Sequence, residues 1–181
     1  MSRDALIQHL KSHALRTDGP FTLRSGAVSS WYLDGRQVTF DGTGAWSVGR
    51  AFAEALDPTV QAVGGMTMGA DPIAVATAMA SSQSGRQLQA FSIRKEAKNH
   101  GTGGRLVGPV VPGTRVALVE DATTTGSATR EAADAAMDAG LVIVQVIVMV
   151  DRSGGKAEEN LSHLGVPFVA LVTPADLGVE L

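Results

Sequence analysis

The sequence predicts an α/β fold built on an open, mostly parallel β-sheet with helices on both faces. Short apolar runs recur from Val60 onward, and alanine-rich segments of helical length separate them. These runs do not alternate between polar and apolar residues, which is typical of strands that are covered on both faces. They lie at 61–63, 88–93, 115–119 and 141–150. A chain of 181 residues fits a single domain around such a sheet.

Composition and charge narrow the class of protein. Hydrophobic residues make up 44% of the chain and charged residues 18%, which favours a folded domain over a disordered one. A net charge of -3 argues against a general nucleic-acid-binding protein. The absence of cysteine excludes disulfides and thiolate metal sites. No apolar run resembles a signal peptide or a membrane span, so we expect a cytoplasmic protein without nucleic-acid or membrane partners.

Two helices are predicted before the sheet begins. Ser2 is placed to cap the first helix. The apolar residues of that helix have helical spacing and form one stripe: Leu6, Ile7, Leu10 and Ala14. We expect it to act as a lid or a brace. Short strands and loops are predicted over 21–40, and a second helix over 43–56.

Further helices are predicted between the strands, at 72–82, 126–139 and 154–164. Each is entered through a loop rich in Gly, Asp, Ser or Thr. In open parallel sheets, ligands bind at the carboxyl ends of the strands, where such loops gather. The stretch 99–113 has many glycines and no apolar periodicity, so we expect a long mobile loop there that serves as a lid.

The junction after the strand 115–119 has the composition of a site for a phosphorylated sugar. Backbone N–H groups at a helix start can surround a phosphate, and Gly126 lets the backbone approach it. Glu120 and Asp121 can accept hydrogen bonds from the two vicinal hydroxyls of a ribose. Alternatively, these acids simply cap the next helix. No Gly-Lys-Ser/Thr motif is present, which excludes a Walker-type loop.

Four potential cations precede the glycine-rich stretch, and they are Arg94, Lys95, Lys98 and His100. Donors of this kind can stabilise the negative charge of a departing pyrophosphate, and a lid that closes over it keeps water away. A histidine beside phosphate is readily protonated near neutral pH. Alternatively, these four residues belong to a solvated charged loop that has no catalytic role. We place the lid at about 94–109.

Several motifs together resemble one enzyme family. The string VALVEDATTTGSA at 116–128 is similar to the phosphoribosyl pyrophosphate signature of type I phosphoribosyltransferases. Within that family, FSIRKEAKNHGTGG at 91–104 resembles the lid of orotate phosphoribosyltransferases. The strings FTLRSGAVSSWYLD and VDRSGG match the same subfamily. The resemblance implies a type I phosphoribosyltransferase fold with a small hood formed by about 1–40 and 152–181.

The resemblance also implies roles for individual residues. It predicts that Lys98, His100 and Asp121 are catalytic. The residues expected to bind substrate are Arg24, Tyr32, Leu33, Arg94, Lys95, Lys98, His100, Glu120, Asp121, Ala122, Thr123, Thr124, Thr125, Gly126, Ser127, Ala128 and Arg152. Among these, Tyr32, Leu33, Thr124 and Arg152 are expected at the orotate. A guanidinium matches a planar carboxylate, although a structural salt bridge to Asp151 or another acid is the alternative for Arg152.

The sequence departs from the family pattern at two places. The pyrophosphate loop is expected at 64–69, where small residues let main-chain N–H groups face phosphates. Some family members have a lysine at the position of Gly69, so one cation is missing here. Arg24 stands where a lysine is common. An ordinary turn is the alternative for the glycine-rich loop.

The implied activity is transfer of phosphoribose from phosphoribosyl pyrophosphate to orotate, giving orotidine 5′-monophosphate and pyrophosphate in pyrimidine synthesis. Mg²⁺ is the expected cofactor, held by substrate oxygens and water rather than by protein ligands. His9 and His13 are four residues apart but lack a third metal ligand. The resemblance implies a homodimer that shares lid residues. Alternatives are a purine or uracil phosphoribosyltransferase, or a non-catalytic regulator that senses phosphoribosyl pyrophosphate.

Overall fold

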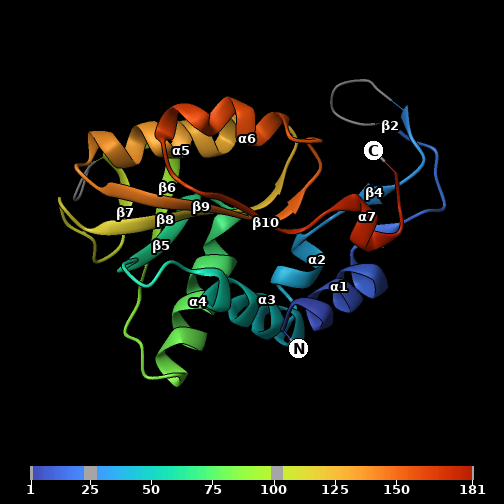
Figure 1. Ribbon diagram of the computed structural model, residues 1–181, viewed down its shortest axis with the longest axis horizontal. Coiled ribbons are helices and arrows are strands. Elements are labelled where there is room, and N and C mark those ends of the chain that lie inside the picture. Colours follow the sequence, from blue (N-terminus) through green and yellow to red (C-terminus); the bar gives the residue numbers. More distant parts are fainter. Residues whose placement is uncertain (1, 23–27, 99–103, 181) are drawn as a thin grey trace.

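The computed structural model describes residues 2–22, 28–98 and 104–180, and its centre is a sheet of six strands in the order β10-β9-β8-β5-β6-β7 (Figure 1). The strands are β5 (Ala62–Met66), β6 (Gln89–Lys98), β7 (Gly104–Val107), β8 (Arg115–Thr123), β9 (Val142–Asp151) and β10 (Phe168–Val172). All neighbouring strands are parallel except β6 and β7. The predicted α/β class and mostly parallel sheet are confirmed.

The strand order reverses between β5 and β8. From β5 the chain moves outward to β6 and β7, then returns to the other side of β5 as β8 and continues outward to β9 and β10. The loops at the carboxyl ends of β5 and β8 therefore diverge to opposite faces of the sheet. Such a switch point leaves a crevice in which open α/β proteins bind ligands.

Helices cover both faces of the sheet, as Figure 1 shows. On one side lie α3 (Gly42–Ala55) and α4 (Ala70–Gln83), and on the other lie α5 (Ser127–Asp138), α6 (Lys156–Leu161) and the short η1 (Ser162–Leu164). The side chains of β8 divide between two cores: Ala117 and Val119 pack on the α3 side, and Val116 and Leu118 on the α5 side. This division explains the unbroken apolar character of the strand.

The hood lies at one end of the sheet and is formed by segments distant in sequence (Figure 1). It comprises α1 (Ser2–His13), β1 (Leu15–Arg16), β2 (Phe21–Thr22), β3 (Val28–Ser29), β4 (Tyr32–Leu33), α2 (Arg36–Thr39) and α7 (Pro174–Leu177). Leu6 and Leu10 of α1 are fully buried, and the helix packs against α3 and α7. Of the two roles expected for this helix, the packing supports the brace.

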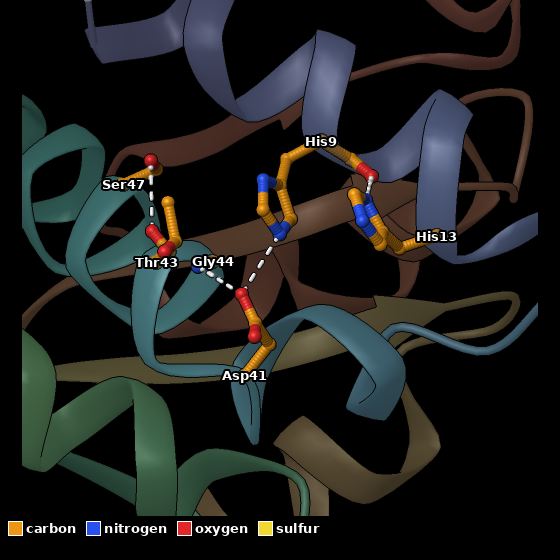
Figure 2. A network of polar contacts seen from close by, with 6 residues as sticks. All are labelled: His9, His13, Asp41, Thr43, Gly44 and Ser47. Atoms are coloured by element: carbon orange, nitrogen blue, oxygen red, sulfur yellow. Dashed lines mark hydrogen bonds and ion pairs between the residues drawn. The ribbon is translucent and has the colours of Figure 1, made fainter.

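A polar contact joins the hood to the sheet domain (Figure 2). Asp41 is the N-cap of α3, and its Oδ2 accepts a hydrogen bond of 2.8 Å from the backbone N–H of Gly44. The same oxygen lies 3.0 Å from Nε2 of His9 on α1. His9 and His13 stack with ring centroids 4.2 Å apart. The histidine pair thus braces α1 against the start of α3, and the described residues include no group of three or more metal-ligand side chains.

Three expectations about element boundaries were wrong. The stretch 99–113 is not one long loop, because it contains β7, which pairs with β6 through Ile93 and Leu106. The range 152–181 is not all hood, because β10 pairs with β9 along the edge of the main sheet. The strand 115–119 is longer, because pairing with β9 continues to Thr123. No helix in the described ranges is long and apolar enough to span a bilayer.

Candidate active site

A cavity of about 430 Å³ occupies the crevice at the switch point. It is lined by residues 32–36 of the hood, 66–70 from the end of β5 to the start of α4, Lys95 on β6, 119–122 at the end of β8, and 128–129 on α5. The lining therefore combines segments from the hood, the sheet and the first turn of α5. The charged side chains among them are Asp34, Arg36, Lys95, Glu120 and Asp121.

Glu120 and Asp121 lie in β8 rather than in the loop after it. Neighbouring residues of a strand project to opposite faces, so the two carboxylates flank the end of the strand. Glu120 accepts a hydrogen bond from the hydroxyl of Thr129 on α5. Asp121 lies beside the loop after β5, since a Cβ built on Gly69 would be 2.6 Å from its Oδ1. Both acids can reach one ligand from two sides.

The alternative that these acids merely cap the next helix finds no support. The N-cap of α5 is Gly126, and no side chain caps it. Burial raises the pKa of Glu120 from 4.5 to about 7, although the hydrogen bond from Thr129 opposes this rise. Burial also raises the pKa of Asp121. Acids that are buried without a fixed cation destabilise the fold, which is typical of a functional site.

The turn between β8 and α5 is organised by its own hydroxyl groups. Gly126 has a φ of 75°, a left-handed conformation that favours glycine. Its N–H donates to Oγ1 of the buried Thr123 over 3.0 Å. Thr124, Thr125 and Ser127 are exposed. Because the first N–H groups of a helix lack partners within it, this turn can hold a phosphate in the manner expected from sequence.

The glycines of the loop 64–69 serve two different purposes. Gly64 and Gly65 lie in β5, where an added Cβ would be 2.2 Å from the carbonyl oxygen of Phe91 and 2.3 Å from that of Val119. They are required by close strand packing and do not line the cavity. Residues 66–69 do line it. Asp71 accepts a 2.6 Å hydrogen bond from the hydroxyl of Thr67, which holds this turn.

Two of the predicted basic residues, Arg94 and Lys95, lie on opposite faces of β6. Lys95 lines the cavity, whereas Arg94 lies on the opposite face in a hollow shared with Arg105 and Leu106. Alternation along a strand enforces this separation. His100, Arg24 and the side chain of Lys98 lie outside the described residues.

Of the residues expected to contact orotate, some line the cavity and others do not. Tyr32 and Leu33 line the cavity, but Arg152 does not. The guanidinium carbon of Arg152 lies 4.2 Å from the ring centroid of Trp31, and its buried Nε has no hydrogen-bond partner. Burial lowers the pKa of Arg152. The alternative pairing with Asp151 is absent from the described ion pairs, and the Asp151 carboxylate instead accepts a hydrogen bond from the N–H of Ser153.

Sequence reasoning missed three polar side chains that line the cavity: Asp34, Arg36 and Thr129. Asp34 and Arg36 directly follow Tyr32 and Leu33, so their place in the chain was a signal that could have found them. Thr129 lies in the first turn of a predicted helix, where its hydroxyl faces back towards β8. Nothing in the local sequence distinguishes it from the threonines before it.

A cavity at the switch point of a parallel sheet, with paired acids beside a helix start able to hold phosphate, defines a type I phosphoribosyltransferase. A curated relative, the orotate phosphoribosyltransferase of Streptomyces avermitilis, is 41% identical over 179 residues, which cover 98% of this chain and 98% of the relative. The chain therefore belongs to the orotate phosphoribosyltransferase family.

Solved structures agree with this membership, although no family model matches the chain. The orotate phosphoribosyltransferase of Mycobacterium tuberculosis in complex with Fe(III) dicitrate superposes with a TM-score of 0.86 at 35% identity, covering 99% of this chain and 100% of that one. The same Mycobacterium tuberculosis enzyme in complex with phosphoribosyl pyrophosphate has a TM-score of 0.82 at 32% identity, with coverage of 99% and 100%. These two structures of an orotate phosphoribosyltransferase confirm the predicted fold class.

Proposed function

We propose that this chain transfers phosphoribose from phosphoribosyl pyrophosphate to orotate, giving orotidine 5′-monophosphate and pyrophosphate in de novo pyrimidine synthesis. The bond between C1 of the ribose and the pyrophosphate oxygen breaks, and a bond from C1 to N1 of orotate forms. The observation that carries the proposal is the position of Glu120 and Asp121 in one cavity with the start of α5. The relative solved with phosphoribosyl pyrophosphate supports the same donor.

Different residues of the cavity bind different parts of the substrate. The two carboxylates accept hydrogen bonds from the ribose hydroxyls, and residues 123–128 surround the 5′-phosphate. Lys95 faces the cavity and is available to the pyrophosphate. The ring nitrogen of orotate is already acidic, so a strong general base is unnecessary. Positioning and electrostatic stabilisation then supply most of the rate enhancement.

Mg²⁺ is part of this proposal. The described residues include no group of three or more His, Cys, Asp or Glu side chains that could hold a metal ion. Two adjacent carboxylates in an open cavity nevertheless suit an ion that keeps most of its water and is held by phosphate oxygens. When bound, the ion would neutralise charge on the pyrophosphate. Glu120 and Asp121 would contact its water shell and the ribose.

A homodimer that works in the cytoplasm completes the proposal. The absence of cysteine fits a reducing compartment. Three exposed apolar side chains form a stripe along α4 and the turn before it, with exposed fractions of 60% for Met68, 54% for Val75 and 61% for Met79. Met68 also lines the cavity, so a second copy seated on this α4 stripe would reach the cavity mouth.

The test is an ultraviolet assay with Mg²⁺ and phosphoribosyl pyrophosphate, run in parallel with orotate, uracil, hypoxanthine and adenine. We expect turnover with orotate alone. Conversion of a purine or uracil in place of orotate would contradict the proposed substrate. Binding of phosphoribosyl pyrophosphate without turnover of any base would favour the non-catalytic regulator.

A further inference from the structure

The pyrophosphate side of the cavity lacks a cation on the loop after β5. The side chains that line the cavity from this loop are Met66, Thr67 and Met68, and the loop ends at Gly69. A side chain at residue 69 would have its Cβ 2.6 Å from Oδ1 and 3.0 Å from Cγ of Asp121. The buried carboxylate therefore occupies the space that a lysine at this position would need.

Arg36 lies on the other side of the same carboxylate. It is the first residue of α2, and a Cβ built on its neighbour Gly35 would be 3.8 Å from Oδ2 of Asp121. Asp121 is thus held between the loop that carries Gly69 and the segment that carries Arg36. Arg36 also opposes the rise that burial causes in the pKa of Asp121, which is consistent with this proximity.

The guanidinium of Arg36 is held at one end and open at the other. Its Nε donates to Oδ1 of Asp34 over 2.9 Å, and the backbone N–H of Arg36 donates to the same oxygen over 3.3 Å. Within the part of the chain that the structure describes, Nη1 and Nη2 have no hydrogen-bond partner. The side chain is 55% exposed and lines the cavity, so these N–H groups can reach a ligand.

We propose that Arg36 binds the pyrophosphate group of phosphoribosyl pyrophosphate and supplies the cation that the loop after β5 lacks. This inference rests on the proposed function. Among the charged side chains that line the cavity within the described ranges, Asp34, Glu120 and Asp121 are acids, and Arg36 and Lys95 are bases. A highly anionic donor needs cations of this kind beside it. Two free N–H groups of a guanidinium match two phosphate oxygens in a fixed planar geometry, which the ammonium group of a lysine lacks.

The test compares Arg36→Gln and Arg36→Lys with Arg50→Gln as a matched control. Arg50 lies on α3, pairs with Glu54 at 3.7 Å and does not line the cavity. We expect Arg36→Gln to raise KM for phosphoribosyl pyrophosphate and Kd for inorganic pyrophosphate with Mg²⁺ by about tenfold or more, because a charge-assisted pair is lost. KM for orotate should stay unchanged. Arg36→Lys should recover part of the loss, and Arg50→Gln should behave as wild type.

Other outcomes would overturn the assignment. A rise in KM for orotate alone would place Arg36 at the base. An unchanged Kd for pyrophosphate with a lower thermal midpoint would make the Asp34 pair purely structural. Both results require an active wild-type protein, so failure of wild type to convert orotate refutes the proposed function, whereas failure of the variants to differ refutes only the role of Arg36.

Discussion

At the scale of single residues, the cavity places its acids where they are unfavourable for folding. Glu120 is half-buried, and its hydrogen bond comes from a neutral hydroxyl rather than from a cation. Its pKa rises from 4.5 to about 7, chiefly because burial disfavours the charged form. A ribose whose hydroxyls donate to the carboxylate, or a hydrated Mg²⁺, reverses that preference. The destabilisation that the buried acid causes is therefore linked to the use of the site.

This linkage predicts how stability depends on pH. Between pH 4.5 and about 7, the folded protein holds the proton of Glu120 more tightly than the unfolded chain does. The free energy of unfolding should therefore fall as pH rises through this window, by roughly 2–4 kcal/mol from this group alone. Glu120→Gln should flatten the decline and unfold at higher denaturant than wild type at pH 8. Urea titrations at pH 5, 7 and 8 measure both effects.

The control for this prediction is Glu158→Gln, because Glu158 is exposed on α6 and remote from the cavity lining. It should retain the wild-type dependence on pH. Glu120→Gln should also bind phosphoribosyl pyrophosphate more weakly, since a neutral amide is a poorer acceptor for the diol than a carboxylate. A Glu120→Gln protein as pH-dependent as wild type would contradict the raised pKa.

At the scale of elements, the ends of β5 and β8 determine the shape of the site. The turn after β5 passes so close to β8 that a Cβ added at Gly69 would be 2.6 Å from Oδ1 of Asp121. The turn after β8 requires Gly126 in a left-handed conformation, and its start is fixed by Thr123. Each turn thus forms one wall of the cavity, and β8 carries the acids between them.

Gly69→Ala tests this closeness. Residue 69 has a φ of -60°, so alanine fits the backbone and the fold should be retained. The added methyl group must displace the carboxylate of Asp121, because its ideal position is 2.6 Å from Oδ1. We expect KM for phosphoribosyl pyrophosphate to rise by about tenfold or more, which corresponds to the loss of roughly one hydrogen bond to a charged group. Steady-state kinetics measure this.

Gly42→Ala is the matched control, since an added Cβ there meets nothing within 4 Å. It should leave both Michaelis constants unchanged. If Gly69→Ala also left the KM for phosphoribosyl pyrophosphate unchanged, Asp121 would not need its observed position to bind the ribose.

At the scale of the whole molecule, the hood, the sheet and the α4 stripe meet at one cavity mouth. Tyr32 and Arg36 come from the hood, while Lys95 and Glu120 come from the sheet. Exposed apolar side chains beside a polar cavity are typical of surfaces that another protein covers. The proposed partner buries this stripe beside the cavity mouth.

Met79→Glu tests the proposed dimer. A charge placed in an apolar interface opposes association, so this variant should shift to the mass of one 18.7 kDa chain and lose most activity. Met137→Glu is the control, because Met137 is 47% exposed on α5, on the other face of the sheet. It should keep the wild-type mass and rate. Light scattering after gel filtration gives the masses, and a monomeric wild type with full activity would refute the shared site.

Much of the fold could be predicted because its signals are local. The strands β8 and β9 are continuous apolar runs, Leu6 and Leu10 of α1 have helical spacing, and the start of α5 is marked by Gly126. The boundaries of β7 and β10 could not be predicted in this way. Both are edge strands of five residues or fewer, and their pairing with distant partners stabilises them.

The sequence by itself determined the class of fold and the chemistry of the acid pair and phosphate turn, because these depend on residues that are adjacent in the chain. Only the tertiary structure decided which cations face the cavity. Arg94 and Lys95 are neighbours in sequence but lie on opposite faces of β6, while Arg36 reaches the site from the hood. The direction of a side chain depends on strand register and on contacts between distant segments, and these form only when the chain folds.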